Sequence, residues 1–282
     1  MKRTTILSAI LLVALAVFGQ KAQIKVMYET KAPSLATKTQ KPTKMVLLAG
    51  KDGSYYYNTM SQYVDSMNST PEGKSKLREI QMKAWMVQGP EGMSFDLSKG
   101  NAPLKKVHTY IIKDENNSIV YGEWADEHGY YAEPKNEQQW TIVEDSTQTV
   151  LGYECIMATM DYHGRKWKAW FTTEIPVSDG PWKFCGLPGL ILKVEDNDNL
   201  FHFIATGLES VDMEMPSLYM KNEYSEVDRK AALRDNEQYR ANMEANLRAR
   251  FNTTVVKHVD DNGNEVAAPV YKREIHAIEP DF

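Results

Sequence analysis

The stretch that decides the fold is Tyr153-Glu154-Cys155-Ile156-Met157-Ala158-Thr159-Met160-Asp161-Tyr162-His163-Gly164-Arg165-Lys166-Trp167-Lys168-Ala169-Trp170-Phe171. His163-Gly164 supplies a two-residue turn, because glycine takes a positive φ without strain. Pairing Tyr162 with Arg165 across this turn sets the register of both strands. One face then holds the apolar pairs Met160–Trp167, Ala158–Ala169 and Ile156–Phe171, and the other face places Asp161 opposite Lys166. The stretch therefore predicts a half-buried antiparallel hairpin.

Outward from this hairpin, short apolar and aromatic runs alternate with turn residues, which is typical of strands. Asp52-Gly53 and Asn197-Asp198-Asn199 are the clearest of the other turn signals. The expected strands are 24–30, 45–48, 54–57, 107–112, 119–124, 140–144, 190–195 and 200–204, and a late hairpin is expected to pair 253–259 with 266–271 around Asn262-Gly263.

Two segments lose the strand pattern and predict helices. Residues 61–67 and 71–85 suit short helices, the second opened by Pro71. Residues 226–250 contain no Gly or Pro, and Ser225 with Asp228 resembles a capping box, so we expect one long helix there. Its apolar stripe is thin (Ala232, Tyr239, Met243, Leu247 and Phe251), which places it on the surface of the sheet.

The fold class is therefore mainly β, a β-rich α+β protein. We expect a curved antiparallel sheet or open barrel, with short helices and one long surface helix. Residues 20–282 are expected to form a single β-rich domain, with 216–252 as a helical insertion or extension.

The first 19 residues are typical of a secretory signal peptide. Lys2 and Arg3 precede the apolar run 6–18, which is shorter than the roughly 20 residues that span a bilayer, and Val17 and Gly19 suit cleavage after Gly19. We therefore expect an exported protein, periplasmic, associated with the outer membrane or secreted, with no transmembrane segment in the mature chain. Loss of Lys2 and Arg3 takes the net charge from −5 to −7, which argues against nucleic acid as a partner.

The chain has 2 cysteines, Cys155 and Cys185, both in the expected mature chain. An even number in an exported protein favours a disulfide, whose loop of about 30 residues is worth roughly 3–4 kcal/mol. Two separate thiols are the alternative.

The hexapeptide Gly186-Leu187-Pro188-Gly189-Leu190-Ile191 resembles the signature of the GLPGLI family of exported Gram-negative proteins. The order of the flanking pieces adds to the likeness: Gly152-Tyr153-Glu154-Cys155, Ala169-Trp170-Phe171-Thr172, Glu174-Ile175-Pro176, Gly180-Pro181 and Lys183-Phe184. The resemblance implies export and a shared β fold, but no catalytic residues. We interpret Leu187-Pro188-Gly189-Leu190 as a type II turn feeding a buried strand. The alternative is a contact surface, with Trp170, Trp182 and Phe184 as contact aromatics.

Residues that suggest a particular chemistry are few. We expect no catalytic residue, no metal ligand and no cofactor. Glu123, Asp126, Glu127 and His128 form the densest group of potential metal ligands, but a solvated hairpin end explains them better. Asp161 and His163 resemble an acid–base pair at a turn that excludes water poorly. Asp196 and Asp198 resemble a calcium loop in composition only.

Three hypotheses for function follow. The first is a non-enzymatic cell-envelope protein that binds a ligand or a protein partner, for example as an accessory of an outer-membrane system. The second is a carrier or chaperone for lipid or lipoprotein, which requires an apolar groove. The third is an unrecognised hydrolase, which requires a cleft with converging polar groups. The expected partner is an envelope protein or an apolar ligand.

Overall fold

The computed structural model of the chain is dominated by one open sheet of 12 strands. It describes residues 21–33, 42–89, 92–95, 101–125, 127–242, 245–246, 248–249, 258–259, 265–267 and 270–282. The expected signal peptide, residues 1–19, lies outside this range. Within the described chain, no helix has the length and apolar character needed to cross a membrane.

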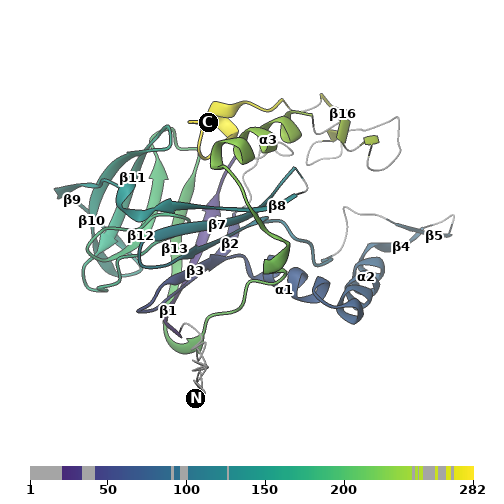
Figure 1. The fold of residues 1–282 in the computed structure, drawn as a ribbon, viewed down its shortest axis with the longest axis horizontal. Coiled ribbons are helices and arrows are strands. Elements are labelled where there is room, and N and C mark those ends of the chain that lie inside the picture. The colour runs from purple at the N-terminus through teal and green to yellow at the C-terminus, as the bar shows by residue number, and fades with distance from the viewer. Residues whose placement is uncertain are drawn as a thin grey trace, which may run out of the picture.

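The sheet consists of two consecutive meanders that meet at the first strand. Its strands are β1 (Lys21–Lys31), β2 (Thr43–Ala49), β3 (Ser54–Tyr57), β6 (Thr109–Lys113), β7 (Asn117–Trp124), β8 (Glu127–Pro134), β9 (Thr141–Val150), β10 (Tyr153–Tyr162), β11 (Arg165–Thr172), β12 (Leu190–Asp196), β13 (His202–Glu214) and β14 (Ser225–Glu226). The spatial order is β14-β8-β7-β6-β3-β2-β1-β13-β12-β11-β10-β9, so β1 pairs with both β2 and β13. All neighbours are antiparallel except β14, which runs parallel to β8. The sheet is strongly twisted, with β7 and β8 lying nearly across the direction of β10 to β13 (Figure 1). The mainly β prediction is confirmed as one large open antiparallel sheet, and not as a closed barrel.

The β10–β11 hairpin has the predicted register, from Tyr162 opposite Arg165 to Ile156 opposite Phe171. His163 (φ 50°) and Gly164 (φ 79°) both take positive φ values. Two successive positive φ values are the mark of the hairpin turn whose twist matches that of the strands. The turn thus fixes where the His163 side chain points.

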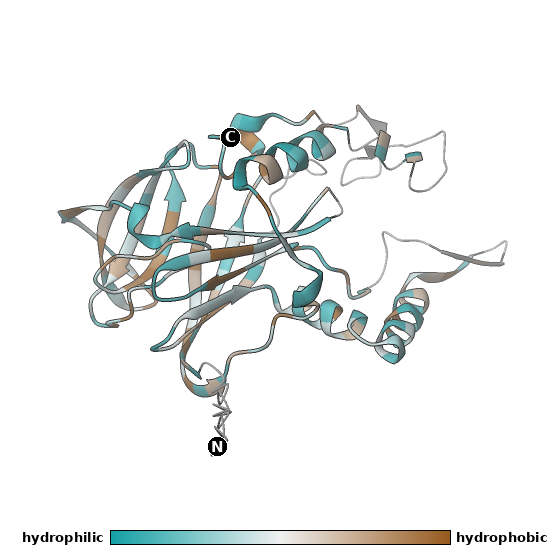
Figure 2. Cartoon of the chain, viewed as in Figure 1, coloured by the Kyte–Doolittle hydropathy of each residue, from teal (hydrophilic) through white to brown (hydrophobic). Residues whose placement is uncertain are grey.

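Two short helices follow β3, as predicted. In α1 (Thr59–Asn68) the Asn58 side chain caps the N-terminus, and in α2 (Pro71–Trp85) Thr70 does the same ahead of Pro71. Figure 2 shows α2 as largely hydrophilic, in contrast to the hydrophobic segments of the sheet. A small hairpin, β4 (Met86–Gly89) with β5 (Gly92–Phe95), extends from α2 where no strand was expected.

The predicted long surface helix is not confirmed. Ser225 lies in β14, and α3 (Arg229–Ala241) has Asp228 as its N-cap and Asn242 as its C-cap. The Ser225 capping box is therefore wrong, because β8 offers an edge to which Ser225 and Glu226 add as a strand. Three stripe positions, Met243, Leu247 and Phe251, lie outside the described residues. Of the late hairpin, the described residues include β15 (His258–Val259) and β16 (Glu265–Val266), which pair with each other.

Hydrophobic side chains are buried on both faces of the sheet. One cluster joins β1, β2, β3, β6, β7 and β8 to Ala232 of α3, and a second lies around Trp167, Phe184 and Phe203. Figure 1 shows α3 and the C-terminus at one end of the sheet and α1 and α2 at another. The C-terminal segment, with α5 (Arg273–His276), therefore lies beside α3 over the sheet.

Candidate functional site

A cavity of about 640 Å³ lies among the sheet, α3 and the C-terminal segment. Its size is in the usual range for sites that hold small molecules. The sheet lines it with Met45, Tyr56, Val120, Trp124, Tyr131 and Phe203. Trp124 and Tyr131 stack on one another with ring centroids 5.5 Å apart. This part of the lining is therefore apolar and aromatic.

The opposite side of the cavity comes from α3 and the C-terminal segment. Leu233, Asn236 and Arg240 of α3 line it, at the three- and four-residue spacing that brings side chains to one helix face. Tyr271, Ile278 and Phe282 contribute from the C-terminal segment. The cavity therefore exists only while that segment stays in place.

The β10–β11 turn holds the C-terminal segment. Arg165 donates hydrogen bonds to the carbonyl oxygens of Ala277 (2.6 and 3.2 Å) and Glu274 (2.8 Å). Its remaining nitrogen pairs with Asp196 at 3.0 Å, and both side chains are buried. A neighbouring arginine, Arg273, pairs with Glu237 of α3. The segment is thus attached to both the hairpin and the helix.

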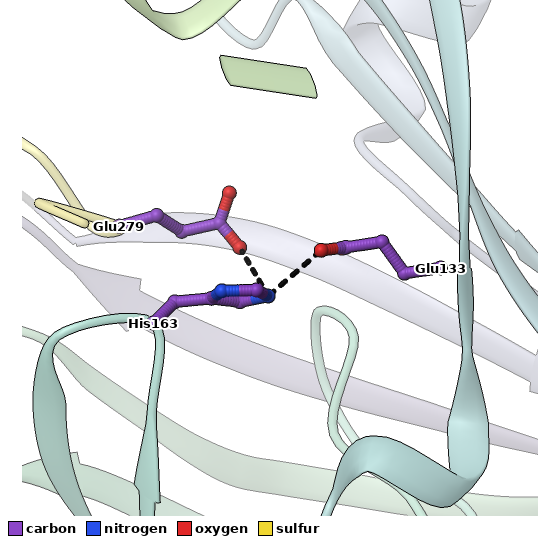
Figure 3. Close-up of side chains that lie close together, drawn as sticks. All are labelled: Glu133, His163 and Glu279. Carbon is purple, nitrogen blue, oxygen red and sulfur yellow. Dashed lines mark ion pairs between the residues drawn. The ribbon is translucent and has the colours of Figure 1, made fainter. Parts of the chain in front are cut away.

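A buried charge cluster forms the second attachment of the C-terminal segment. We use this name for Glu133, His163, Lys183, Arg229, Glu279 and Asp281. Figure 3 shows Glu133, His163 and Glu279 converging from β8, the hairpin turn and the C-terminal segment. Nε2 of His163 lies 2.7 Å from a carboxylate oxygen of Glu133, but the two groups are not aligned for a hydrogen bond. Nδ1 of the same ring lies 3.0 Å from a carboxylate oxygen of Asp281.

Two cations complete the buried charge cluster. The Lys183 ammonium is fully buried and contacts both Glu133 and Glu279. Arg229 at the start of α3 pairs with Asp281 at 2.6 Å and lies 3.3 Å from Glu133. Buried carboxylates need such partners, because an unpaired buried charge is costly. The cluster joins five separate parts of the chain in one network.

Two carboxylates of this cluster, Glu133 and Asp281, are held in their ionised form. Burial alone would raise the pKa of Glu133, but the contacts with His163 and Lys183 outweigh it and lower the pKa to about 2. Burial likewise opposes ionisation of Asp281, yet Arg229 and His163 lower its pKa to about 2. Glu133 and Asp281 are therefore charged at every pH near neutrality.

The trio Glu133, His163 and Glu279 could offer three ligand atoms to a metal ion, since these atoms all lie within 4.8 Å of one another. However, the Lys183 ammonium already contacts the two carboxylates of the trio. A divalent cation would have to displace a buried positive charge. The arrangement therefore fits an ion-pair network better than a metal site.

The other candidate groups lie apart from the cavity and from each other. Glu123 contacts Lys105, His108 (2.6 Å) and His128 (3.2 Å) in a separate network, and Asp126 lies outside the described residues. Asp161 pairs with the exposed Lys166 at 3.2 Å. His163, in the turn, instead contacts Glu133 and Asp281, so the two residues form no acid–base pair.

The predicted disulfide is not present in the structure. Cys155 and Cys185 are both free and buried. Cys155 packs in the hydrophobic cluster with Trp170 and Leu190, whereas Cys185 lies beside Gln138 and the charge of Lys113. Burial raises the pKa of the Cys155 thiol to about 11 and also raises that of Cys185. The two thiols occupy different surroundings. The even number of cysteines, on which the prediction of a disulfide was based, carries no information about these surroundings.

The hexapeptide is a structural turn, but not of the predicted type. The positive φ belongs to Gly186 (90°) and not to Gly189, whose N–H donates to the Leu187 carbonyl at 2.8 Å. Gly189 is required for another reason: a Cβ there would lie 2.0 Å from the Thr172 carbonyl oxygen. Leu190 and Ile191 then enter β12 fully buried. The motif thus lets the chain pass close against the end of β11.

Only one of the proposed contact aromatics reaches the cavity among the described residues. Trp182 lines it, while Trp170 and Phe184 are buried in the two hydrophobic clusters. Sequence reasoning missed Lys183, Arg229, Glu279 and the cavity itself. Lys183 adjoins the hexapeptide, but its burial depends on residues 50 and 96 positions away, for which a single sequence carries no signal.

Comparisons with known proteins add little about function. Residues 163–193 match a family model described as "Protein of unknown function (Porph_ging)". This short range includes the hexapeptide and gives weak support to the resemblance that the motif suggested. No curated protein matches the chain.

Two solved structures, described as PNGF-II in the C2 and in the P21 space group, are distantly similar to the chain. The first is 12% identical with a TM-score of 0.48, and the match covers 76% of this chain and 32% of that one. The second is 14% identical with a TM-score of 0.47, covering 77% and 34%. The chain thus spans about a third of the length of these proteins.

Proposed function

We propose that this protein is a non-enzymatic binding protein of the cell envelope, and that its cavity holds a small amphipathic ligand. The observation that carries the proposal is the aromatic cavity of about 640 Å³. Aromatic and aliphatic walls with a few polar groups are the usual lining of a small-molecule site. Export through the expected signal peptide would place the protein where such ligands are transferred between membranes.

The cavity also supports the carrier hypothesis, because that hypothesis requires an apolar groove. The hydrolase hypothesis has less support. It required polar groups that converge on a cleft, whereas the carboxylates of the buried charge cluster face Lys183 and Arg229. Glu279 lines the cavity, but its carboxylate is among these paired groups.

Fluorescence titration with N-phenyl-1-naphthylamine, a neutral aromatic probe, tests the proposal. We expect saturable binding, with energy transfer from Trp124 and Trp182 in the lining. Thr109→Trp should fill the cavity and weaken binding at least about tenfold, because the added ring takes the space of the probe. Thr147→Trp on the exposed face of β9 is the matched control and should bind as the wild type does.

Melting curves of both variants establish that they are folded. Absence of probe binding to the wild type, or equal binding by folded Thr109→Trp, would contradict the proposal. Mass spectrometry of lipids that copurify from the native envelope would then identify the natural ligand.

A further inference from the structure

Arg240 differs from the other arginines that surround the C-terminal segment. Arg165, Arg229 and Arg273 each pair with a carboxylate. Arg240 lines the cavity and is partly buried, yet no carboxylate among the described residues forms an ion pair with it. Its contact is the ring of Tyr271, with the guanidinium carbon 5.2 Å from the centroid.

Among the described residues, the groups around Arg240 do not form an ion pair that compensates its charge. The ring of His276 stacks on that of Tyr271, with the two centroids 5.4 Å apart. A second basic group therefore lies next to the ring that Arg240 contacts. The acidic residue that lines the cavity, Glu279, contacts Lys183 and Arg229 instead. Burial lowers the pKa of Arg240, which is the expected effect of removing a cation from water.

Resting on the proposed function, we propose that the ligand of the cavity carries an anionic head group, a carboxylate or a phosphate, which pairs with Arg240. The guanidinium presents paired N–H donors that match the oxygens of either group. The apolar body of the ligand would then lie against Trp124, Trp182 and Phe203. The ligand class is an amphiphile with a single acidic end.

Two probes with the same aromatic body test this inference. 8-Anilinonaphthalene-1-sulfonate carries a negative charge, and N-phenyl-1-naphthylamine is its neutral counterpart. Arg240→Met should weaken binding of the anionic probe about tenfold or more and leave the neutral probe within twofold, because charge-assisted hydrogen bonds are lost only by the anion. Arg234→Met, at an exposed position of α3, is the matched control and should change neither.

The outcomes separate the two proposals. If the neutral probe binds the wild type but Arg240→Met affects both probes equally or neither, the anionic head group is wrong and the cavity proposal stands. If neither probe binds the wild type, both proposals fail. Competition by dodecanoate, dodecyl phosphate and dodecanol then compares the head groups at constant chain length. Displacement by dodecanol as strong as by either anion would overturn the inference.

Discussion

The residues that matter most individually are the buried ions. Lys183 is the clearest case, because its ammonium is fully buried, contacts two carboxylates and lies 4.7 Å from the centroid of the Trp182 ring. Removing one partner from such a group leaves charges without compensation. The buried charge cluster as a whole contributes less to the free energy of unfolding than is lost when one of its members is removed.

Lys183→Met should therefore destabilise the protein strongly. We expect a loss of about 3–5 kcal/mol in the free energy of unfolding, since Glu133 and Glu279 lose their shared cation. Lys166→Met is the matched control. Lys166 pairs with Asp161 while both side chains are 73% exposed, and exposed pairs contribute at most about 1 kcal/mol. Denaturant unfolding measures both, and equal stability of the two variants would refute this role for Lys183.

At the scale of elements, the hexapeptide and the β10–β11 hairpin determine how the second meander is built. The hairpin turn aims His163 at the buried charge cluster. The hexapeptide brings the chain against the end of β11 before β12 begins. Both features are local turns, and residues beside them hold the C-terminal segment: Arg165 binds Ala277, and Lys183 contacts Glu279.

Gly189→Ala should be far more harmful than Gly152→Ala. A Cβ at Gly189 would meet the backbone oxygen of Thr172 at 2.0 Å, so the strands must separate, at a cost of about 3 kcal/mol or more. Gly152 has a positive φ of 85° but nothing within 4 Å of its Cβ position, so strain of about 1–2 kcal/mol is expected. Thermal unfolding compares the two variants, and a greater loss at Gly152 would show that backbone strain outweighs the close contact.

The elements that could be predicted from sequence are those whose determinants are adjacent in the chain. The register of β10 and β11 was predicted because the turn residues and the facing pairs lie within 19 residues. Helix α2 was recognisable from Pro71 at its start, and α1 from the loss of the strand pattern at residues 61–67.

The predictions that were wrong concern residues whose determinants lie far away in the chain. Ser225 reads as a helix cap until the edge of β8 is known, and Gly189 reads as a positive-φ residue until Thr172 is known. The buried charge cluster takes its members from positions 133 to 281, so neither periodicity nor spacing relates them. The candidate site was therefore beyond sequence reasoning, apart from Trp182 and His163.

At the scale of the whole molecule, the carboxylates of the buried charge cluster link stability to pH. The pKa values of Glu133 and Asp281 are lowered to about 2, from about 4 in an unfolded chain. A lowered pKa stabilises the fold above the unfolded value, and this contribution disappears as the pH falls towards the folded value.

The melting temperature should accordingly fall between about pH 4.5 and pH 2. Glu133→Gln should melt lower at pH 7 and show a shallower fall in acid, because one linked carboxylate is gone. Glu79→Gln should change the acid profile much less, because Lys83 lowers the pKa of Glu79 in an exposed pair that solvent screens. Calorimetry across this pH range tests the prediction, and parallel acid profiles for wild type and Glu133→Gln would contradict it.

The pairing of β1 with β13 affects how the chain folds. Each meander forms by pairing of successive strands, but Lys31 pairs with His202 and Lys21 with Glu214. Some 170 residues or more must therefore be available before the first strand gains its second neighbour. Closing so large a loop is entropically unfavourable and slows folding. Until then, one edge of β1 remains open to strands of other molecules, and newly made chains are most vulnerable to aggregation during that interval.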